Sequence, residues 1–162
     1  KHDFLWRLHV NTPKKGMISI FNRSYYEDIL VPTVEGYIEK DLIERRYDHI
    51  NNFEEMLRDN GTIVLKFFLH MSKDMQRERL DERMEERKKN WKHHASDEVV
   101  RKKWEDYMEV YEDVFKKTNT KHAPWHIIPT DDKWYKVYLV AKTIRDTLKD
   151  LDLQWPELSD AV

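Results

Sequence analysis

One strand–turn–helix pattern near the amino-terminal end constrains the fold more than any other feature of the sequence. The apolar run Met17–Phe21 predicts a short buried strand, and Asn22 and Arg23 follow its carboxyl end. Ser24, with Glu27 three positions later, has the pattern of a capping box, which predicts that a helix begins there. Ligands of open α/β sheets bind at the carboxyl ends of the strands. Arg23 is therefore placed to meet phosphate oxygens with its planar set of donors.

The rest of the chain alternates between apolar runs and amphipathic segments. Nearly continuous apolar residues at 62–70 predict a central parallel strand covered on both faces. A shorter run at 125–128 predicts a third strand. Helical spacing and start signals predict the helices around these strands, at 3–10, 24–30, 41–60, 73–88, 96–118 and from 131 onward. This order predicts an α/β fold with a three-layer parallel sheet and flanking helices.

Two of the predicted helices have well-marked apolar faces. The helix at 41–60 opens with a capping box formed by Asp41 and Glu44, and its expected core stripe consists of Ile43, Tyr47, Ile50 and Leu57. Ser72 and Ser96 are expected caps of later helices, and either Asp131 or Asp132 is expected to start the last helix. The last helix is expected to turn one set of side chains inward: Trp134, Val137, Tyr138, Ala141, Ile144 and Leu148.

Composition narrows the class of protein. With 162 residues, 40% hydrophobic and 12% aromatic, the chain is long and apolar enough to form a core rather than stay disordered. A net charge of −2 provides no overall attraction to nucleic acid, so any anion site must be local. The absence of Cys rules out a disulfide framework, and no apolar run has membrane-spanning length. Cytoplasmic localisation, with no membrane partner, is the expectation.

A second candidate site is the charged helix at 73–88. Arg79, Arg83 and Arg87 recur every four residues, and Lys92 extends the positive charge beyond them. One interpretation is a solvated face of Glu–Arg pairs; the other is a mobile lid, spanning about 73–95, whose cations close over phosphates. The turn at Arg23 also has two interpretations: a phosphate-binding site, or simply the end of a strand followed by a capped helix without a binding role. None of the three glycines belongs to a GxxxxGK phosphate loop.

Several blocks of sequence lie in order along nearly the whole chain, among them Phe21–Asp28, Arg46–Glu54, Leu65–His70 and Ala123–Trp125. Taken together, these blocks resemble those of the polyphosphate kinase 2 family. The resemblance implies a P-loop kinase-like fold of the thymidylate-kinase type. It also implies Mg²⁺-dependent phosphoryl transfer, with Mn²⁺ as the alternative ion, between inorganic polyphosphate and a nucleoside diphosphate (ADP or GDP), in either direction.

The resemblance also implies roles for particular residues. Arg23 and Arg83 are the catalytic candidates, as phosphate and lid cations respectively. Asn22, Glu27, Arg79 and Lys92 are expected to contact phosphate or nucleotide; no metal ligand is assigned. Asn22 stands where many members of the family carry an Asp, and an amide is a weaker ligand for a hard cation than a carboxylate.

The family's Walker A segment has no counterpart in this sequence. We therefore expect a single partial kinase domain, the carboxyl-terminal part of a larger one, which is inactive alone. Two alternatives remain: a non-catalytic polyphosphate- or nucleotide-binding remnant or assembly module, and an ATP-dependent nucleoside monophosphate kinase. A homo-oligomer, dimer or tetramer, is expected, with the aromatic helix near 96–117 as its contact.

Overall fold

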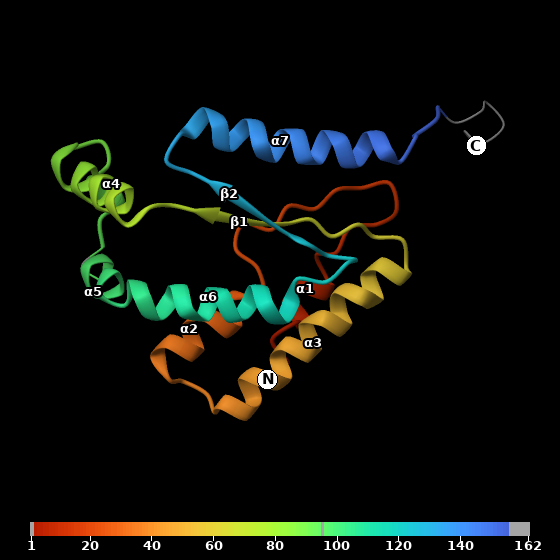
Figure 1. Cartoon of the computed structure of the whole chain (residues 1–162), viewed down its shortest axis with the longest axis horizontal. Helices are drawn as coiled ribbons and strands as arrows, with labels where there is room; N and C mark the ends of the chain where they lie inside the picture. Colours follow the sequence, from red (N-terminus) through yellow and green to blue (C-terminus); the bar gives the residue numbers. More distant parts are fainter. Residues whose placement is uncertain (1, 95, 156–162) are drawn as a thin grey trace. The chain divides into compact units, whose positions relative to one another are not determined.

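A computed structural model describes residues 2–94 and 96–155. The described residues form a series of helices interrupted by two short strands, as Figure 1 shows. The elements are α1 (Trp6–His9), α2 (Glu27–Glu35), α3 (Lys40–Asp59), β1 (Lys66–His70), α4 (Lys73–Glu85), the 3₁₀ turn η1 (Asn90–Lys92), α5 (Asp97–Lys102), α6 (Trp104–Thr118), β2 (Trp125–Pro129) and α7 (Lys133–Asp150).

The chain forms two compact units. The first contains the described residues up to Lys66 together with Leu80–His126, and the second contains Phe67–Arg79 and the described residues from Ile127 onward. The first unit therefore holds most of the helices, and the second holds most of both strands, the first turns of α4, and α7.

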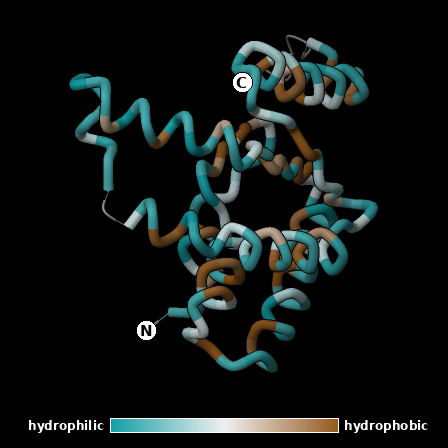
Figure 2. The backbone as a smooth tube through the Cα atoms, turned by 60° about the vertical axis from the view of Figure 1, so that its left-hand side comes forward, coloured by the Kyte–Doolittle hydropathy of each residue, from teal (hydrophilic) through white to brown (hydrophobic). Residues whose placement is uncertain are grey.

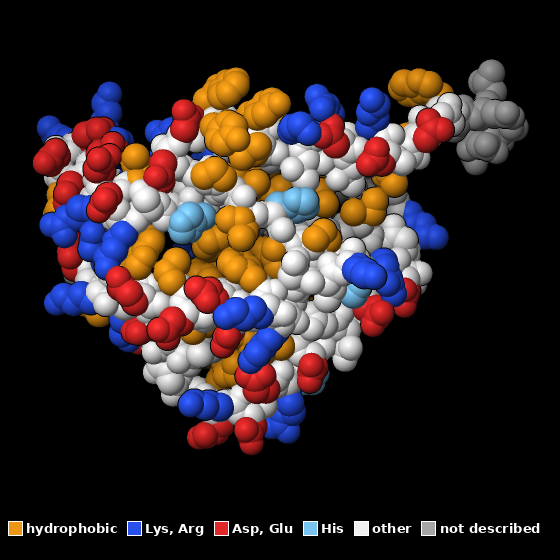
Figure 3. Space-filling view, viewed as in Figure 1, with side chains coloured by type: hydrophobic (Ala, Val, Ile, Leu, Met, Phe, Trp, Pro, Cys, Tyr) orange, Lys and Arg blue, Asp and Glu red, His pale blue; other side chains and the backbone are white. Residues whose placement is uncertain are grey.

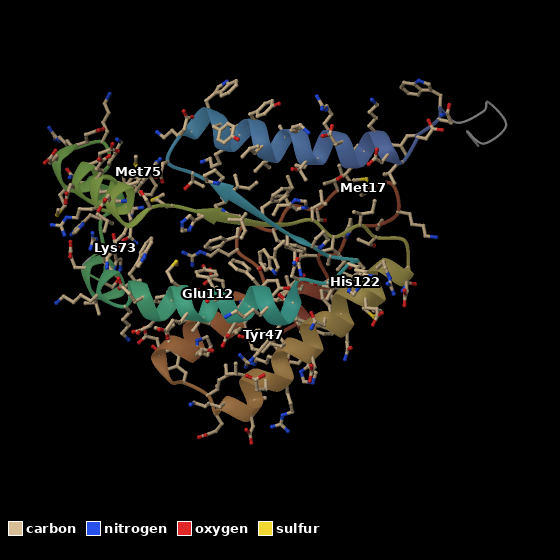
Figure 4. All side chains as sticks on the ribbon, in the orientation of Figure 1. Met17, Tyr47, Lys73, Met75, Glu112 and His122 are labelled. Atoms are coloured by element: carbon tan, nitrogen blue, oxygen red, sulfur yellow. The ribbon has the colours of Figure 1, made fainter. Side chains whose placement is uncertain are left out.

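The core of the first unit is helical. α2 packs against both α3 and α6, and α3 packs against α6. The predicted stripe of α3 is confirmed for Ile43, Tyr47 and Ile50, which are all buried, and Tyr47 lies where α3 approaches α6 (Figure 4). Burying one such apolar side chain stabilises the fold by about 1.5–3 kcal/mol. This core positions the turn that precedes α2.

The second unit contains a small parallel sheet. β1 and β2 run side by side in the same direction (Figure 1). Just past their carboxyl ends, the backbone N–H of Thr130 donates to the His70 carbonyl over 2.8 Å. Two predicted caps are confirmed here: the Ser72 hydroxyl accepts from the N–H of Met75, and the Asp132 carboxylate accepts from the N–H of Tyr135.

The predicted strand at Met17–Phe21 is wrong. These residues form no strand, and Ile20 is 87% exposed. The reason is that a strand needs a neighbour for its backbone N–H and C=O groups, whereas the described sheet consists of β1 and β2 alone. The predicted central strand is also shorter than 62–70, and Leu69 is half exposed rather than covered on both faces.

Helix boundaries depart from the prediction at several points. α2 begins after Tyr26 and α3 after Glu39, neither with a side-chain cap, so both predicted capping boxes are wrong. The helix expected at 96–118 breaks at Lys103. α7 buries none of its residues, and its expected inward residue Trp134 is 74% exposed. Its own unit supplies just two short strands and part of α4, too little surface to cover a helix of this length.

Candidate phosphate-binding turn

The turn at residues 22–24 presents an arginine in an unusual backbone conformation. Arg23 has φ of +68°, in the left-handed region that non-glycine residues seldom occupy. Its side chain is exposed, and in the part of the chain that the structure describes no carboxylate pairs with its guanidinium. A left-handed residue of this kind costs roughly 1–2 kcal/mol. The surrounding structure therefore has to hold it in place.

Two consecutive buried tyrosines anchor this turn. Tyr25 and Tyr26 follow Ser24 directly, and both are about 95% buried, with 5% and 4% of their surface exposed. The Ser24 hydroxyl accepts weakly from the N–H of Tyr26 over 3.4 Å, and the Ser24 carbonyl accepts from the N–H of Glu27 over 3.2 Å. Arg23 therefore lies immediately before a firmly packed segment.

Both tyrosines end on one buried carboxylate. The Tyr25 and Tyr26 hydroxyls donate to Glu54 Oε1 over 2.6 and 2.8 Å, and the other oxygen, Oε2, accepts from Lys66 Nζ over 2.8 Å. Lys66 Nζ also donates to the Tyr26 hydroxyl and to the Thr118 carbonyl, over 3.0 and 2.7 Å. Glu54 is fully buried and Lys66 is 5% exposed. We call these four side chains, Tyr25, Tyr26, Glu54 and Lys66, the anchor network.

The electrostatics of the anchor network favour hydrogen-bond donation by the phenols. Burial, with the Glu54 carboxylate beside them, raises the pKa of Tyr25 and of Tyr26 far above the ordinary value, so both hydroxyls keep their protons. Burial lowers the pKa of Lys66, against the opposing effect of Glu54. All three N–H groups of the Lys66 ammonium have an acceptor, which such a buried cation requires.

The first turn of α2 carries two further carboxylates. Asp28 forms an ion pair with Arg7 over 2.6 Å, and its carbonyl accepts from Arg46, whose guanidinium lies over the Phe4 ring. Glu27 is half-buried, and its charge helps to raise the pKa of Tyr111 to about 12, after the larger effect of burial. Glu27 thus places a partly exposed carboxylate at the start of α2, close in sequence to Arg23.

The predicted lid cations lie on α4 and just beyond it. Arg83 forms an ion pair with Asp97 over 3.2 Å, and its carbonyl accepts from the Asn90 side chain. Lys92, in η1, is exposed, and its ammonium lies 5.2 Å from the centre of the Trp91 ring. α4 is mostly hydrophilic (Figure 2), and acidic and basic side chains are interspersed over it (Figure 3).

Arg79 belongs to the second unit, where it lies near the end of β2. Its Nε is buried without a hydrogen-bond partner. The neighbouring Asp131 accepts from the backbone N–H of Ser72 over 3.0 Å, and this bond, with a smaller contribution from Arg79, lowers the pKa of Asp131. Arg79 is thus placed at the carboxyl ends of the two strands.

The structure brings some of the predicted residues together and leaves others apart. Asn22 and Arg23 lie in the turn before α2, and Glu27 is the first residue of α2. Arg83 and Arg23 share no ion-pair partner within the described residues. That the two arginines bind the same phosphate chain therefore stays a prediction. No group of three or more acidic or imidazole side chains suited to a metal ion occurs in the described ranges.

Sequence reasoning missed Glu54 and Lys66. A signal was present: Glu54 continues the α3 stripe of Tyr47, Ile50 and Leu57 at steps of three and four, and Lys66 interrupts the apolar run at 62–70. A charged residue at a position whose neighbours are buried must find a buried partner of opposite charge. The pairing partner itself lies too far along the chain for local patterns to identify.

The fold and the turn define an α/β protein that presents an uncommitted arginine from a buried anchor, an arrangement suited to an anion. The family model "Polyphosphate kinase 2 (PPK2)" matches residues 1–156. The chain belongs to the polyphosphate kinase 2 family. Among the described residues, no helix combines the length and the apolar character that crossing a membrane requires.

Individual relatives agree with this family. The chain is 46% identical over 155 residues to the AMP/ADP-polyphosphate phosphotransferase of Meiothermus ruber, covering 96% of this chain and 58% of the relative. It is 40% identical to the ADP-polyphosphate phosphotransferase of Rhodopseudomonas palustris, covering 99% of this chain and 60% of that relative. The crystal structure of polyphosphate kinase 2 from Arthrobacter aurescens TC1 matches with a TM-score of 0.94 at 43% identity, covering 96% of this chain and 55% of that one. The chain thus spans little more than half the length of these proteins.

Proposed function

We propose that the chain is part of an enzyme that transfers phosphoryl groups between inorganic polyphosphate and a nucleoside diphosphate such as ADP. The observation that carries the proposal is Arg23, exposed and unpaired in a left-handed turn that the anchor network holds. The names of the relatives from M. ruber and R. palustris, both ADP-linked polyphosphate phosphotransferases, support the same substrate class.

The proposal extends to architecture. We place the chain in a three-layer, P-loop kinase-like domain of which it forms one part, with residues 73–95 as the lid. The composition of α4 supports a lid, because Leu80 is its one buried residue within the described range and most of its other side chains are polar or charged. A helix with so little apolar burial loses little when it moves.

Phosphoryl transfer of this type depends mainly on position and charge. Arg23 would bind phosphate oxygens with its fork of donors, and Arg83, released from Asp97, would neutralise charge from the lid side. A divalent cation, Mg²⁺ or Mn²⁺, would neutralise phosphate charge when bound. The Glu27 carboxylate is the kind of oxygen ligand that would hold it, because Mg²⁺ commonly takes one or two protein carboxylates and completes its shell with phosphate and water.

The test uses a chimera in which this chain replaces the matching part of the M. ruber relative. ATP formation is measured with ADP and polyphosphate, in parallel with the variants Arg23→Ala and Arg83→Ala and a control, Arg45→Ala, at an exposed position on α3. We expect kcat/KM to fall at least tenfold in the first two variants, a loss of about 1.4 kcal/mol or more of transition-state stabilisation, and to be unchanged in the control.

Three outcomes would overturn parts of the proposal. Unchanged kcat/KM in both arginine variants would remove their assigned roles. A correctly folded but inactive chimera would favour a non-catalytic binding or assembly module. Activity with ATP and a nucleoside monophosphate, but none with polyphosphate, would favour an ordinary nucleotide kinase. Sedimentation of the same chimera tests the proposed dimer or tetramer.

A further inference from the structure

We infer that Glu54 and Lys66 are positioning residues for Arg23: the anchor network that they form fixes the turn from which this arginine is presented. Neither Glu54 nor Lys66 is assigned a contact with substrate. They act through Tyr25 and Tyr26, and the consequence for phosphate binding rests on the proposed function.

The connectivity of the network carries the inference. Glu54 comes from α3 and Lys66 from the start of β1, and the Lys66 ammonium also reaches the carbonyl of Thr118 at the end of α6. The Glu54 carboxylate and the Lys66 ammonium together therefore tie the segment just after Arg23 to α3, β1 and the end of α6. The centre of the Trp125 ring lies 5.1 Å from Lys66 Nζ, so the ring stacks on the ammonium. The Trp125 indole N–H donates to the Thr118 hydroxyl.

The geometry of two adjacent tyrosines adds a second constraint. Tyr25 and Tyr26 are neighbours in the chain, yet their hydroxyls meet the same atom, Glu54 Oε1. This convergence fixes the backbone direction at both residues. The chain then approaches from solvent through the left-handed Arg23. A turn held from one side in this way has little freedom to relax toward an ordinary conformation, which keeps the guanidinium exposed and unpaired.

The polarity of the network is itself informative. An apolar core at this place would be as stable or more so, because buried ion pairs often gain little over well-packed hydrophobic residues. A directional set of hydrogen bonds specifies one arrangement of the turn, as apolar contacts do not. The anchor network is thus suited to precision at Arg23.

The experiment removes the two phenolic hydroxyls without removing the rings. Tyr25→Phe, Tyr26→Phe and the double variant are compared with Tyr47→Phe, a matched control at a buried tyrosine of α3 outside the network. Hydrogen exchange is measured on this chain at the backbone amides of Tyr26 to Ile29, which bond within the turn and the first turn of α2. We expect these amides to exchange at least tenfold faster in the double variant and at the wild-type rate in the control.

A double-mutant cycle of polyphosphate binding tests whether the anchor network acts through Arg23. Affinity for polyphosphate is measured with and without Arg23→Ala in both the wild-type chain and the double phenylalanine variant. When Arg23 is present, we expect removal of the Tyr25 and Tyr26 hydroxyls to weaken polyphosphate binding severalfold. In the Arg23→Ala background, we expect the same change to weaken binding by less than twofold.

Two results would overturn the inference: unchanged exchange at these amides in all variants, or an equal loss of binding whether or not Arg23 is present. If the double variant does not fold, the two single variants decide in the same way. If the wild-type chain shows no affinity for polyphosphate, the claim that this chain binds phosphate through Arg23 fails, and exchange alone still decides whether the network holds the turn.

Discussion

The buried pair of Glu54 and Lys66 gives the sharpest prediction about stability. We consider the isosteric change Glu54→Gln, which leaves an amide facing the Lys66 ammonium where a carboxylate oxygen now lies 2.8 Å away. The two side chains are 0% and 4% exposed, so water cannot compensate the ammonium. Breaking a buried ion pair on one side costs about 3–5 kcal/mol. For a chain of this length, that loss corresponds to a decrease in Tm of about 6–20 °C.

The complementary changes complete a double-mutant cycle. Lys66→Met leaves the carboxylate buried with its two phenol donors, and we expect it to cost about 3 kcal/mol by the same reasoning. The double variant Glu54→Gln/Lys66→Met leaves no buried charge unpaired. Its decrease in the free energy of unfolding should therefore be smaller than the sum of the decreases in the two single variants, by about 2 kcal/mol or more.

The assay is denaturant unfolding followed by far-UV circular dichroism, with all four proteins at the same pH and salt. The ion pair of Lys117 with Glu44, 2.5 Å long but 35% and 60% exposed, provides a control cycle. Its coupling should be below about 1 kcal/mol, because exposed pairs contribute little. Two results would refute the reasoning. One is a decrease in the free energy of unfolding of less than about 1 kcal/mol in each single variant, at Glu54 and at Lys66; the other is a double variant whose decrease equals the sum of the single decreases to within about 0.5 kcal/mol.

Three further predictions follow from particular residues. Arg23→Gly should leave the free energy of unfolding unchanged or raise it by up to about 1 kcal/mol, because glycine adopts the left-handed conformation without strain. Part of this gain is lost, because glycine gives the unfolded chain more conformational entropy. A clear decrease in Tm would show that Arg23 is not strained. Ser72→Ala should destabilise α4 by about 1 kcal/mol, because the N–H of Met75 loses its cap, and equal stability in urea would argue against that bond. Burial raises the pKa of Tyr47 to about 12, so the folded state keeps a proton that the unfolded state releases above its ordinary pKa near 10. The free energy of unfolding should therefore fall as the pH rises from about 10 to 12; Tyr47→Phe should show a shallower fall, and identical slopes would exclude this contribution.

Local features of the structure were predictable from the sequence. The cap at Ser72 forms as predicted, and Asp132, one of the two aspartates expected to start the last helix, caps α7. The cap expected at Ser96 does not form. The α3 stripe of Ile43, Tyr47 and Ile50 is likewise buried, because its spacing reflects helix geometry alone. The family was also predictable, since several sequence blocks in order carry that information.

Features that depend on distant partners were not predictable. Met17–Phe21 has the composition of a strand, but whether it pairs depends on a neighbouring strand that no local pattern supplies. The left-handed conformation of Arg23 was hidden, because no glycine or asparagine occupies that position. The bond between Glu54 and Lys66 joins α3 to β1, and no local sequence pattern shows that these two charges meet.

The central claim, that Arg23 binds phosphate, is tested most directly by calorimetric titration of this chain with inorganic polyphosphate at fixed ionic strength. Arg23→Ala is compared with Arg45→Ala, which removes an equal charge from an exposed position of α3. We predict that the wild-type chain and Arg45→Ala bind alike and that Arg23→Ala binds at least tenfold more weakly, a difference of about 1.4 kcal/mol. Equal affinity in all three proteins would contradict it.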